Sequence, residues 1–393
     1  MNQPEARLPE VDDLRKRSLV VGVVALLLCA VGAAVNPPEF FHAYLMGYLL
    51  WIGIALGCLA ILMLHHLVSG RWGFAIQRLL ESGSRTLPLM ALLFVPLLFG
   101  LRELYLWARP EAVAAQEILR HRQPYLNTPF FSIRLVVYFV VWIGLALLLC
   151  KWSEEQDRTA APDLTRRLRL LSGPGLVLYG VTVTFAVFDW VMTLGPQWHS
   201  TIFGMAFIVG QCLAALCLMV LVSSWLARRG PLRPVMSPQH FHDLGNLMLA
   251  FVMLWAYIAF SQYLIIWSGN LPDEIPWYVS RMGGTWLWIA MFLITFHFAV
   301  PFLLLLSRAT KRRAEMLVGV ALGVLCMRLV DLFFIVVPAF HPERISLHWL
   351  DFAAPIGIGG IWLWMFLGHL QGKSLLPLHD PRFAVVSEQA HGV

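Results

Sequence analysis

Ten apolar stretches, each close to the length needed to cross a lipid bilayer, constrain the fold of this chain more than any other feature. A transmembrane helix needs roughly 20 apolar residues in succession. Here the apolar residues cover the whole helix circumference, as in helices that face lipid or other helices, and they lack the alternation of a membrane barrel strand. The sequence therefore predicts an all-α, polytopic membrane protein with ten transmembrane helices. The expected spans are Leu19–Ala34, His42–Leu64, Leu87–Trp107, Ile133–Cys150, Leu176–Leu194, Ile202–Leu226, Leu244–Trp267, Thr285–Leu306, Met316–Val337 and Leu350–His369.

The composition agrees with this class and excludes several others. Hydrophobic residues make up 59% of the chain and charged residues only 13%, whereas soluble domains have about 45–50% and about 25%. So few charged residues cannot cover a water-soluble core. An ordinary globular enzyme, a disordered protein and a nucleic-acid binder are therefore excluded, despite a net charge of +6.

The distribution of Lys and Arg predicts the orientation in the membrane. Of the 29 such residues, 21 lie in the N-terminal segment, the even-numbered connections and the C-terminal tail, and 5 lie in the odd-numbered connections. Because basic loops stay on the cytoplasmic side, we expect a cytoplasmic N-terminal segment (1–18), a membrane domain (19–371) and a cytoplasmic tail (372–393). The leader contains Glu10, Asp12 and Asp13, too acidic for a typical secretory signal, so the first span is expected to be retained.

The connections between spans are too short to fold by themselves. The two longest, Ala108–Ser132 and Lys151–Gly175, have about 25 residues each, below the roughly 50 of a small domain. A catalytic domain or redox centre outside the bilayer would therefore belong to another chain. The connection Ser69–Arg85 mixes apolar side chains with three arginines, which predicts a basic amphipathic helix on the cytoplasmic surface.

The sequence contains no ligand motif for a metal or a covalently bound cofactor. All six cysteines lie inside or at the end of expected spans, and none forms a C-x-x-C pair, the spacing typical of iron–sulfur clusters, structural zinc and c-type haem. We therefore expect no metal and no cofactor in this chain. A b-type haem held by a pair such as His66 and His297 is the alternative, although no spacing requires it.

Charged residues inside the spans are the first candidates for function, because each costs about 2.5–3.5 kcal/mol to insert. Arg328 and Asp331 are three residues apart on one helical face. Two interpretations stay open for them: a self-neutralising structural pair and a proton relay. Arg134 lies near the outer start of the fourth span, where snorkelling of the side chain to the interface explains it.

Asp189 lies one to two turns inside the outer end of the fifth span and has no partner at helical spacing in that span. A poorly solvated acid exchanges protons closer to neutral pH, and His199 offers a second titrating group a few residues away. Thr182, on the same face as Asp189, could extend a hydrogen-bonded line inward. Asp189 and His199 are therefore candidates for a proton path, and a hydrogen bond between helices is the alternative role of Asp189.

His297 lies within the eighth span, four residues before Pro301. Proline has no N–H to donate to the His297 carbonyl, so this carbonyl needs water, a hydroxyl group or a neighbouring helix. A polar pocket is therefore expected near His297, and Tyr257 and Ser261 in the seventh span are further polar groups for a proton path. A hydrogen-bonded core histidine is the alternative.

An internal repeat links the ends of the fifth and ninth spans. Asp189 is followed by a proline at +7, an aromatic residue at +9 and a histidine at +10, and Asp331 is followed by the same types at the same spacing. This pattern indicates two related four-helix units, spans two to five and spans six to nine, with spans one and ten peripheral to them.

Three stretches carry a resemblance to a known family. They are residues 188–204 (FDWVMTLGPQWHSTIFG), 241–257 (with FHDLGN and FVMLWAY) and 260–277 (with FSQYLIIW and NLPDEIPW). These stretches resemble the polysulfide-reductase-like (NrfD-like) membrane subunits of bacterial alternative complex III, a quinol-oxidising respiratory assembly, and especially its smaller, ActF-type subunit. The resemblance covers nearly the whole chain.

The resemblance implies ten helices with two four-helix bundles, in the bacterial inner membrane, with both termini cytoplasmic. It also implies partners: a larger sister membrane subunit of the same fold, an iron–sulfur protein, multihaem and monohaem cytochromes c, small helical subunits, and lipids. Haem c and iron–sulfur clusters would then lie in the partner subunits. Quinol would be oxidised in the complex, in a site generally placed in the sister subunit.

The expected function is therefore a non-catalytic core subunit of a quinol:electron-acceptor (cytochrome c) oxidoreductase, structural and lining a proton path. Three alternatives stay open. The chain could carry its own quinol site at the outer face, with Asp189 and His199 as proton acceptors; it could be an independent secondary transporter; or it could be a scaffold whose polar residues only join helices. The broken helices of a transporter are expected in corresponding spans, whereas Pro96 and Pro301 fall in the third and eighth spans.

Overall fold

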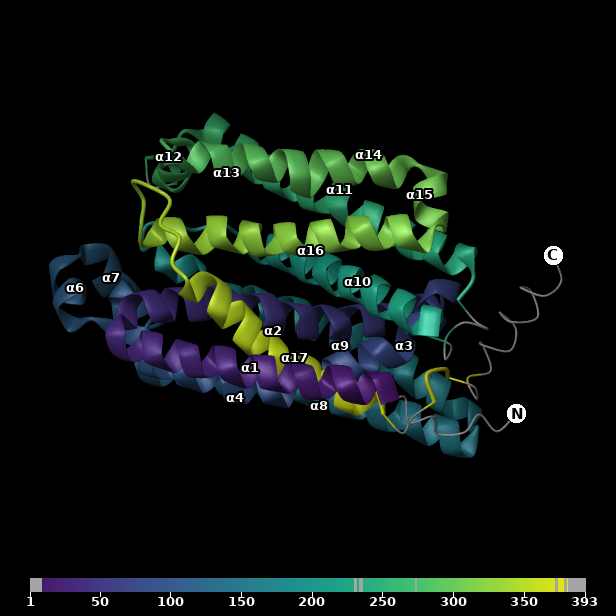
Figure 1. Ribbon diagram of the computed structural model, residues 1–393. Coiled ribbons are helices and arrows are strands. Elements are labelled where there is room, and N and C mark those ends of the chain that lie inside the picture. Colours follow the sequence, from purple (N-terminus) through teal and green to yellow (C-terminus); the bar gives the residue numbers. More distant parts are fainter. Residues whose placement is uncertain are drawn as a thin grey trace.

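Figure 1 shows a computed structural model of the chain, which describes residues 9–229, 232, 236–272, 274–371, 374–377 and 380. Every regular element among these residues is helical, so the all-α prediction is confirmed. Within these described ranges, ten segments are long and apolar enough to cross a membrane. These helices make the chain a multi-pass α-helical membrane protein.

The ten spans correspond one to one with the ten stretches expected from the sequence. They are α1 (Pro9–Val35), α2 (Pro37–Val68), α3 with α4 (Arg71–Ser84 and Leu87–Phe99), α8 (Thr128–Thr159), α9 (Pro162–Trp190), α10 (Phe203–Arg229), α11 (Pro238–Gly269), α13 with η3 and α14 (Trp286–Leu293, Ile294–Ala299 and Val300–Leu306), α16 (Ala314–Val336) and α17 (Leu350–Leu370). The connecting helices are α5 (Leu101–Leu104), η1 (Leu106–Ala108), α6 (Pro110–Ala115), α7 (Glu117–Arg122), η2 (Met192–Leu194), α12 (Ile275–Met282), α15 (Arg308–Arg312) and η4 (Val337–Ala339). We call the end that carries α6, α7 and α12 the outer end, following the predicted orientation (Figure 1).

The ends of several spans are set by local backbone chemistry. Ser69, Ala160 and Asn270 follow α2, α8 and α11 in the left-handed conformation, with φ of 56°, 52° and 50°, which closes the last helical turn. α8 begins where the Asn127 side chain accepts a hydrogen bond from the Phe130 N–H at 2.9 Å. This contact satisfies one of the free donors at the start of a helix.

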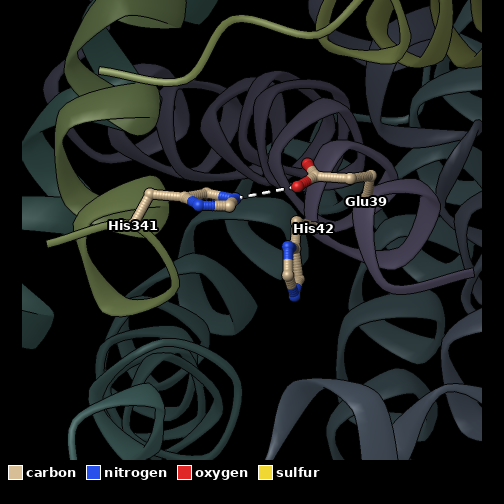
Figure 2. Close-up of side chains that lie close together, drawn as sticks. All are labelled: Glu39, His42 and His341. Carbon is tan, nitrogen blue, oxygen red and sulfur yellow. Dashed lines mark hydrogen bonds and ion pairs between the residues drawn. The ribbon is translucent and has the colours of Figure 1, made fainter. Parts of the chain in front are cut away.

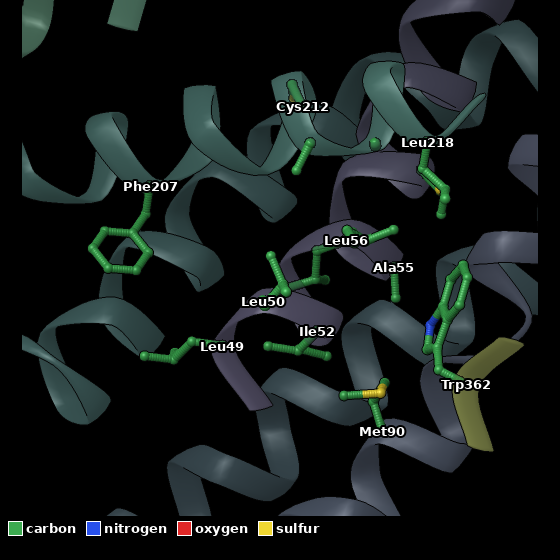
Figure 3. Packing of buried hydrophobic residues seen from close by; sticks show 14 of the residues in the cluster. Leu49, Leu50, Ile52, Ala55, Leu56, Met90, Phe207, Cys212, Leu218 and Trp362 are labelled. Carbon is green, nitrogen blue, oxygen red and sulfur yellow. The ribbon is translucent and has the colours of Figure 1, made fainter. Parts of the chain in front are cut away.

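α2 is the central helix of the fold. It packs against α1, α3, α4, α9, α10, α16 and α17, and nearly all of its side chains are buried. In Figure 3, Ile52 and Leu56 of α2 lie between Cys212 of α10 and Trp362 of α17. Because neighbouring helices surround it, this helix is buried in protein rather than exposed to lipid.

α1 and α17 cross in close contact at a pair of glycines. A Cβ atom on Gly360 would lie 2.4 Å from the Cα atom of Gly22. Small residues allow the backbones of membrane helices to approach this closely. Near the start of α1, the Arg15 guanidinium donates to the Gln371 side chain at 3.0 Å. The start of α1 and the end of α17 therefore lie at the same end of the molecule, opposite the outer end.

The N-terminal boundary differs from the expected one. α1 begins at Pro9, so residues 9–18 of the expected cytoplasmic segment are already helical. Residues 1–8 and most of the expected tail, 372–393, lie outside the described residues.

The connection Ser69–Arg85 does not lie on the surface, and that prediction is wrong. The segment forms the expected helix, α3, but every side chain from Trp72 to Ser84 is buried. α3 and α4 together form the third span, which therefore begins at Arg71 rather than at Leu87.

α3 can be buried because its polar groups have partners within α3 itself and on α8. Arg78 forms an ion pair with Glu81 at 2.7 Å and another with Asp157. Ser153 donates to the Glu81 carboxylate at 2.6 Å. A buried charge is tolerated when it is paired and hydrogen-bonded. Ser153 and Asp157 lie more than 70 positions from these α3 residues, so the spacing of residues within α3 reveals only the Arg78–Glu81 pair.

Candidate functional site

Asp189, near the outer end of α9, is completely buried at 0% exposure. Arg134 of α8 donates from Nε and Nη2 to the two carboxylate oxygens at 2.8 and 2.9 Å. The Tyr138 hydroxyl donates to the same carboxylate at 2.8 Å. A two-point guanidinium–carboxylate contact of this kind is strong and fixes the orientation of both groups.

Arg134 therefore points into the protein, and the prediction that it snorkels to the interface is wrong. Its guanidinium lies 3.8 Å from the ring centre of Tyr125 and 4.5 Å from that of Phe130. Burial, together with the negative charge of Asp189, raises the pKa of Tyr125 to about 12. The phenol thus stays protonated at neutral pH. The whole cluster compensates one buried negative charge with one buried positive charge.

The hydrogen-bonded line expected from Asp189 towards Thr182 is interrupted at Trp142. The indole N–H of Trp142 donates to the Thr182 hydroxyl at 2.8 Å, and that hydroxyl donates to the Leu178 carbonyl at 2.6 Å. An indole N–H is a donor only and cannot accept a proton from a neighbour. These contacts indicate a structural role for Thr182.

Arg328 and Asp331 form the expected ion pair within α16. Both side chains are buried, at 4% and 5% exposure. The guanidinium faces α10, where it lies 5.4 Å from the ring centre of Phe207. A Cβ atom on Gly210 would lie 2.5 Å from its central carbon. The pair therefore occupies a space between α10 and α16 that only a glycine leaves open.

His297 lies in the middle of η3, a π-helical segment that interrupts the eighth span. After this segment the Val300 N–H donates to the Thr295 carbonyl, five residues back. The wider turn comes just before Pro301, which has no N–H of its own. π-helical turns inside α-helices occur frequently at functional sites.

The His297 ring is buried, at 0% exposure, and both of its nitrogens lack a hydrogen-bond partner among the described residues. Its ring centre lies 4.3 Å from that of Trp255 on α11. η3 also packs against α16, the helix that carries Arg328 and Asp331. His297 and the Arg328–Asp331 pair therefore lie on neighbouring elements, although the Arg328 guanidinium faces α10.

The other predicted proton-path residues lie elsewhere. Tyr257 is 66% exposed on the outside of α11, and Ser261, one turn further on, is half-buried. His199 lies in the loop before α10 and forms an ion pair with Glu274 at 3.3 Å. The structure therefore gives His199 a partner other than Asp189.

His66, expected with His297 in the alternative of a b-type haem, lies at the end of α2, is completely buried, and has its ring centre 5.5 Å from that of the neighbouring His65. His65, at the end of α2, has ring contacts with Trp72 and Phe74 of α3 at 5.8 and 4.7 Å. A Cβ atom on Gly73 would lie 1.8 Å from its Nδ1 atom. The space beside this nitrogen is therefore filled by α3, whereas the His297 ring faces α11.

The aromatic positions of the internal repeat have equivalent contacts in the structure. Trp198 stacks on Trp277 of α12, with ring centres 4.6 Å apart. Phe340 stacks on His42 of α2, with ring centres 3.5 Å apart. In each case the aromatic residue at +9 reaches a ring that belongs to the other expected unit.

The histidine positions of the repeat behave in the same way. His199 pairs with Glu274, which lies between α11 and α12. His341 pairs with Glu39 in the first turn of α2, at 2.9 Å. Each histidine at +10 therefore joins its own expected unit to an acid of the other one. The repeated positions thus form contacts between the two expected units.

A cavity of about 390 Å³ opens at the outer end, between the α9–α10 connection, α12 and the end of α16. Its walls are mostly apolar and aromatic; they are Leu106, Gln116, Val191, Met192, Leu194, Gly195, Pro196, Gln197, Trp198, Phe203, Pro276, Trp277, Ser280, Arg281, Ile335, Pro338, Ala339 and Pro342. Burial lowers the pKa of Arg281 to about 9, so its guanidinium remains charged at neutral pH. It lies 3.9 Å from the ring centre of Trp277.

Sequence reasoning missed two features of these sites. The first is the Arg134 partner of Asp189. In two consecutive antiparallel helices, the start of the first lies beside the end of the second. Arg134 near the start of α8 and Asp189 near the end of α9 are opposite charges at equal depth, so their pairing could have been predicted. The second is the Glu39-x-x-His42 spacing at the start of α2, which places two ligand-type side chains on one helical face.

Comparison with the models of known protein families finds no match to this chain. Comparison with curated proteins finds no similar sequence either. The structure thus supports the class of multi-pass α-helical membrane proteins, and its described residues contain buried ion pairs at Arg78–Glu81, Arg134–Asp189 and Arg328–Asp331.

Proposed function

We propose that this chain is an integral membrane core subunit of a quinol:electron-acceptor (cytochrome c) oxidoreductase of the alternative complex III type. It is not the catalytic subunit, and it lines a proton path. The observation that carries the proton path is the completely buried His297 ring in a π-helical turn that packs against α16, the helix with the buried Arg328–Asp331 pair. An imidazole can accept a proton on one nitrogen and release one from the other.

The assignment to this complex rests on the sequence resemblance of residues 188–204 and 241–277. In this proposal the chain lies in the bacterial inner membrane with both termini cytoplasmic. Spans two to five and six to nine form two bundles, joined at the outer end by the His199–Glu274 and His341–Glu39 pairs. A larger sister subunit, an iron–sulfur protein, cytochromes c and small helical subunits surround it. These partners carry the haem c and the iron–sulfur clusters.

Purification of the tagged chain in a mild detergent tests this assignment. We expect c-type haem and iron–sulfur chains to co-elute with it, and the eluted complex to oxidise quinol with cytochrome c as acceptor. A chain that elutes alone, while quinol oxidation persists in membranes that lack it, would contradict the proposal. That result would favour an independent secondary transporter.

A second candidate function is quinol binding by this chain itself at the outer end. The observation that favours it is the 390 Å³ cavity beside the stacked Trp198 and Trp277 rings. Cavities of about 300–1,000 Å³ with mostly apolar walls are typical of small-molecule sites. Asp189 and His199 do not line this cavity. A quinol there would instead meet the polar groups of Ser280 and Arg281.

Filling the cavity separates these two functions. Ala339 is exposed within the cavity wall, so Ala339→Trp should weaken quinone binding by the purified chain about tenfold or more if the cavity is the site. The matched control is Leu347→Trp, in the same outer connection at 65% exposure. Quenching of intrinsic fluorescence by a soluble quinone analogue measures the affinity. Equal affinity in wild type and Ala339→Trp would exclude this cavity as a quinol site.

A further inference from the structure

Glu39, His42 and His341 lie at the outer end of the molecule, and Figure 2 shows their side chains close together. Glu39 and His42 belong to the first two turns of α2, three residues apart and therefore on one face. His341 follows η4, at the end of the ninth span. One ligand-type atom from each of the three side chains lies within 4.8 Å of the other two.

The three side chains are held in place by the surrounding structure. The His42 ring stacks on Phe340 with ring centres 3.5 Å apart and planes inclined by 17°. The indole N–H of Trp286, a fully buried residue, donates to the His341 carbonyl at 3.1 Å. The loop that carries His341 is thereby anchored to the start of the eighth span. Such support fixes the direction from which each ligand approaches a metal ion.

One donor atom of the group is left without a partner. Glu39 and His341 bond to each other at 2.9 Å. His42 is only 8% exposed, and its Nδ1 atom has no hydrogen-bond partner among the described residues. A buried polar atom without a partner costs free energy. An ion bound between the three side chains would remove that cost.

We propose that Glu39, His42 and His341 form a binding site for a divalent transition-metal ion of the zinc class. Two imidazoles and one carboxylate are a donor set that zinc uses, with a fourth position left for water. Ligand atoms of a tetrahedral zinc ion lie about 3.3 Å apart, given metal–ligand bonds of about 2.0–2.1 Å. The Glu39–His341 contact already has nearly this length, and since all three ligand atoms lie within 4.8 Å of one another, His42 needs to move by at most about 1.5 Å towards the pair.

The ion would reach the site from the outer side and would hold two distant parts of the chain together. The side chains of Glu39 and His341 are 21% and 31% exposed, which leaves a route from solvent. These two residues are 302 positions apart. The ion would thus pin the start of α2 to the end of the ninth span, and thermal unfolding should occur at a higher temperature when it is bound.

Metal titration of the full-length purified chain, after removal of bound ions with a chelator, tests the site. We expect one Zn²⁺ per chain at micromolar affinity or tighter, and Co²⁺ should give the visible absorption of a four-coordinate N/O site. His341→Ala and Glu39→Gln should each weaken binding at least about 100-fold, since loss of a supporting partner alone costs about 10–100-fold. His42→Phe should do the same while it keeps the stacking on Phe340.

The matched control is His199→Ala, which removes a histidine paired with Glu274 at the same end of the molecule. That pair has no third ligand-type side chain among the described residues, so affinity should not change. Folded yield and the unfolding temperature without metal identify any variant that fails to fold, and three different ligand variants are available. Equal Zn²⁺ affinity in wild type, His341→Ala and His42→Phe, or no tight site in wild type, would overturn the proposal.

Discussion

Asp189→Leu and Arg134→Leu should each destabilise the chain by about 3–5 kcal/mol, because each leaves the partner charge buried without compensation. The carboxylate is completely buried and both of its oxygens accept hydrogen bonds from the guanidinium. The expected result is a large loss of folded protein in detergent extracts. The unfolding temperature of the purified chain and the monodisperse yield measure it.

The double variant Asp189→Leu with Arg134→Met should recover much of that stability, since neither charge remains. The surface pair Asp163–Arg167 provides the control: its side chains are 57% and 56% exposed, and such pairs contribute only about 0–1 kcal/mol. Asp163→Leu should therefore have little effect. If Asp189→Leu is as mild as Asp163→Leu, the buried pair is not what stabilises α8 against α9.

This pairing also changes what Asp189→Asn can reveal about proton transfer. Asn keeps the shape of the side chain but leaves the Arg134 charge uncompensated, so weaker assembly is expected along with any loss of turnover. A proton role for Asp189 would require lower turnover at full assembly. The contacts of Asp189 favour the structural role, with the three groups of Arg134, Tyr138 and Asp189 held in one geometry.

The fold could be predicted from the sequence because membrane spans are a local property. Twenty apolar residues must form a helix in lipid whatever the rest of the chain does, and all ten spans were found in this way. The prediction for α3 was wrong because a contact between residues distant in sequence decides whether this segment is buried. Arg78 makes the segment look like a surface helix, and only its contacts with Glu81 and the distant Asp157 allow burial.

The site was predictable only where partners are close in sequence. Arg328 and Asp331 are three residues apart on one helix, and their pairing was expected and is present. Arg134 and Asp189 are 55 positions apart, so their contact depends on how α8 and α9 pack. Pro301 correctly drew attention to the backbone around His297. The π-helical turn itself depends on packing that no single spacing encodes.

His297→Phe should leave stability unchanged or raise it slightly, yet lower proton transfer in the assembled complex. Phe keeps an aromatic ring against Trp255 and removes two buried nitrogens that have no hydrogen-bond partner among the described residues, each of which carries a desolvation cost. If the imidazole passes protons, its loss should slow the proton-coupled step about 100-fold or more, the usual worth of a positioned acid–base group. The measurement is the rate of proton translocation and the rate of quinol oxidation, with the complex in liposomes.

Tyr257→Phe is the control for this experiment, since Tyr257 was also expected on the path but is 66% exposed on the outside of α11. Its removal should change neither assembly nor translocation. The two variants together separate a proton path from a packing role. If His297→Phe keeps full translocation and stability, the buried ring serves only to pack against Trp255. His297→Phe could instead fail to assemble while His297→Gln assembles and translocates protons normally. That result would show that the side chain at position 297 supplies a hydrogen bond and does not transfer a proton.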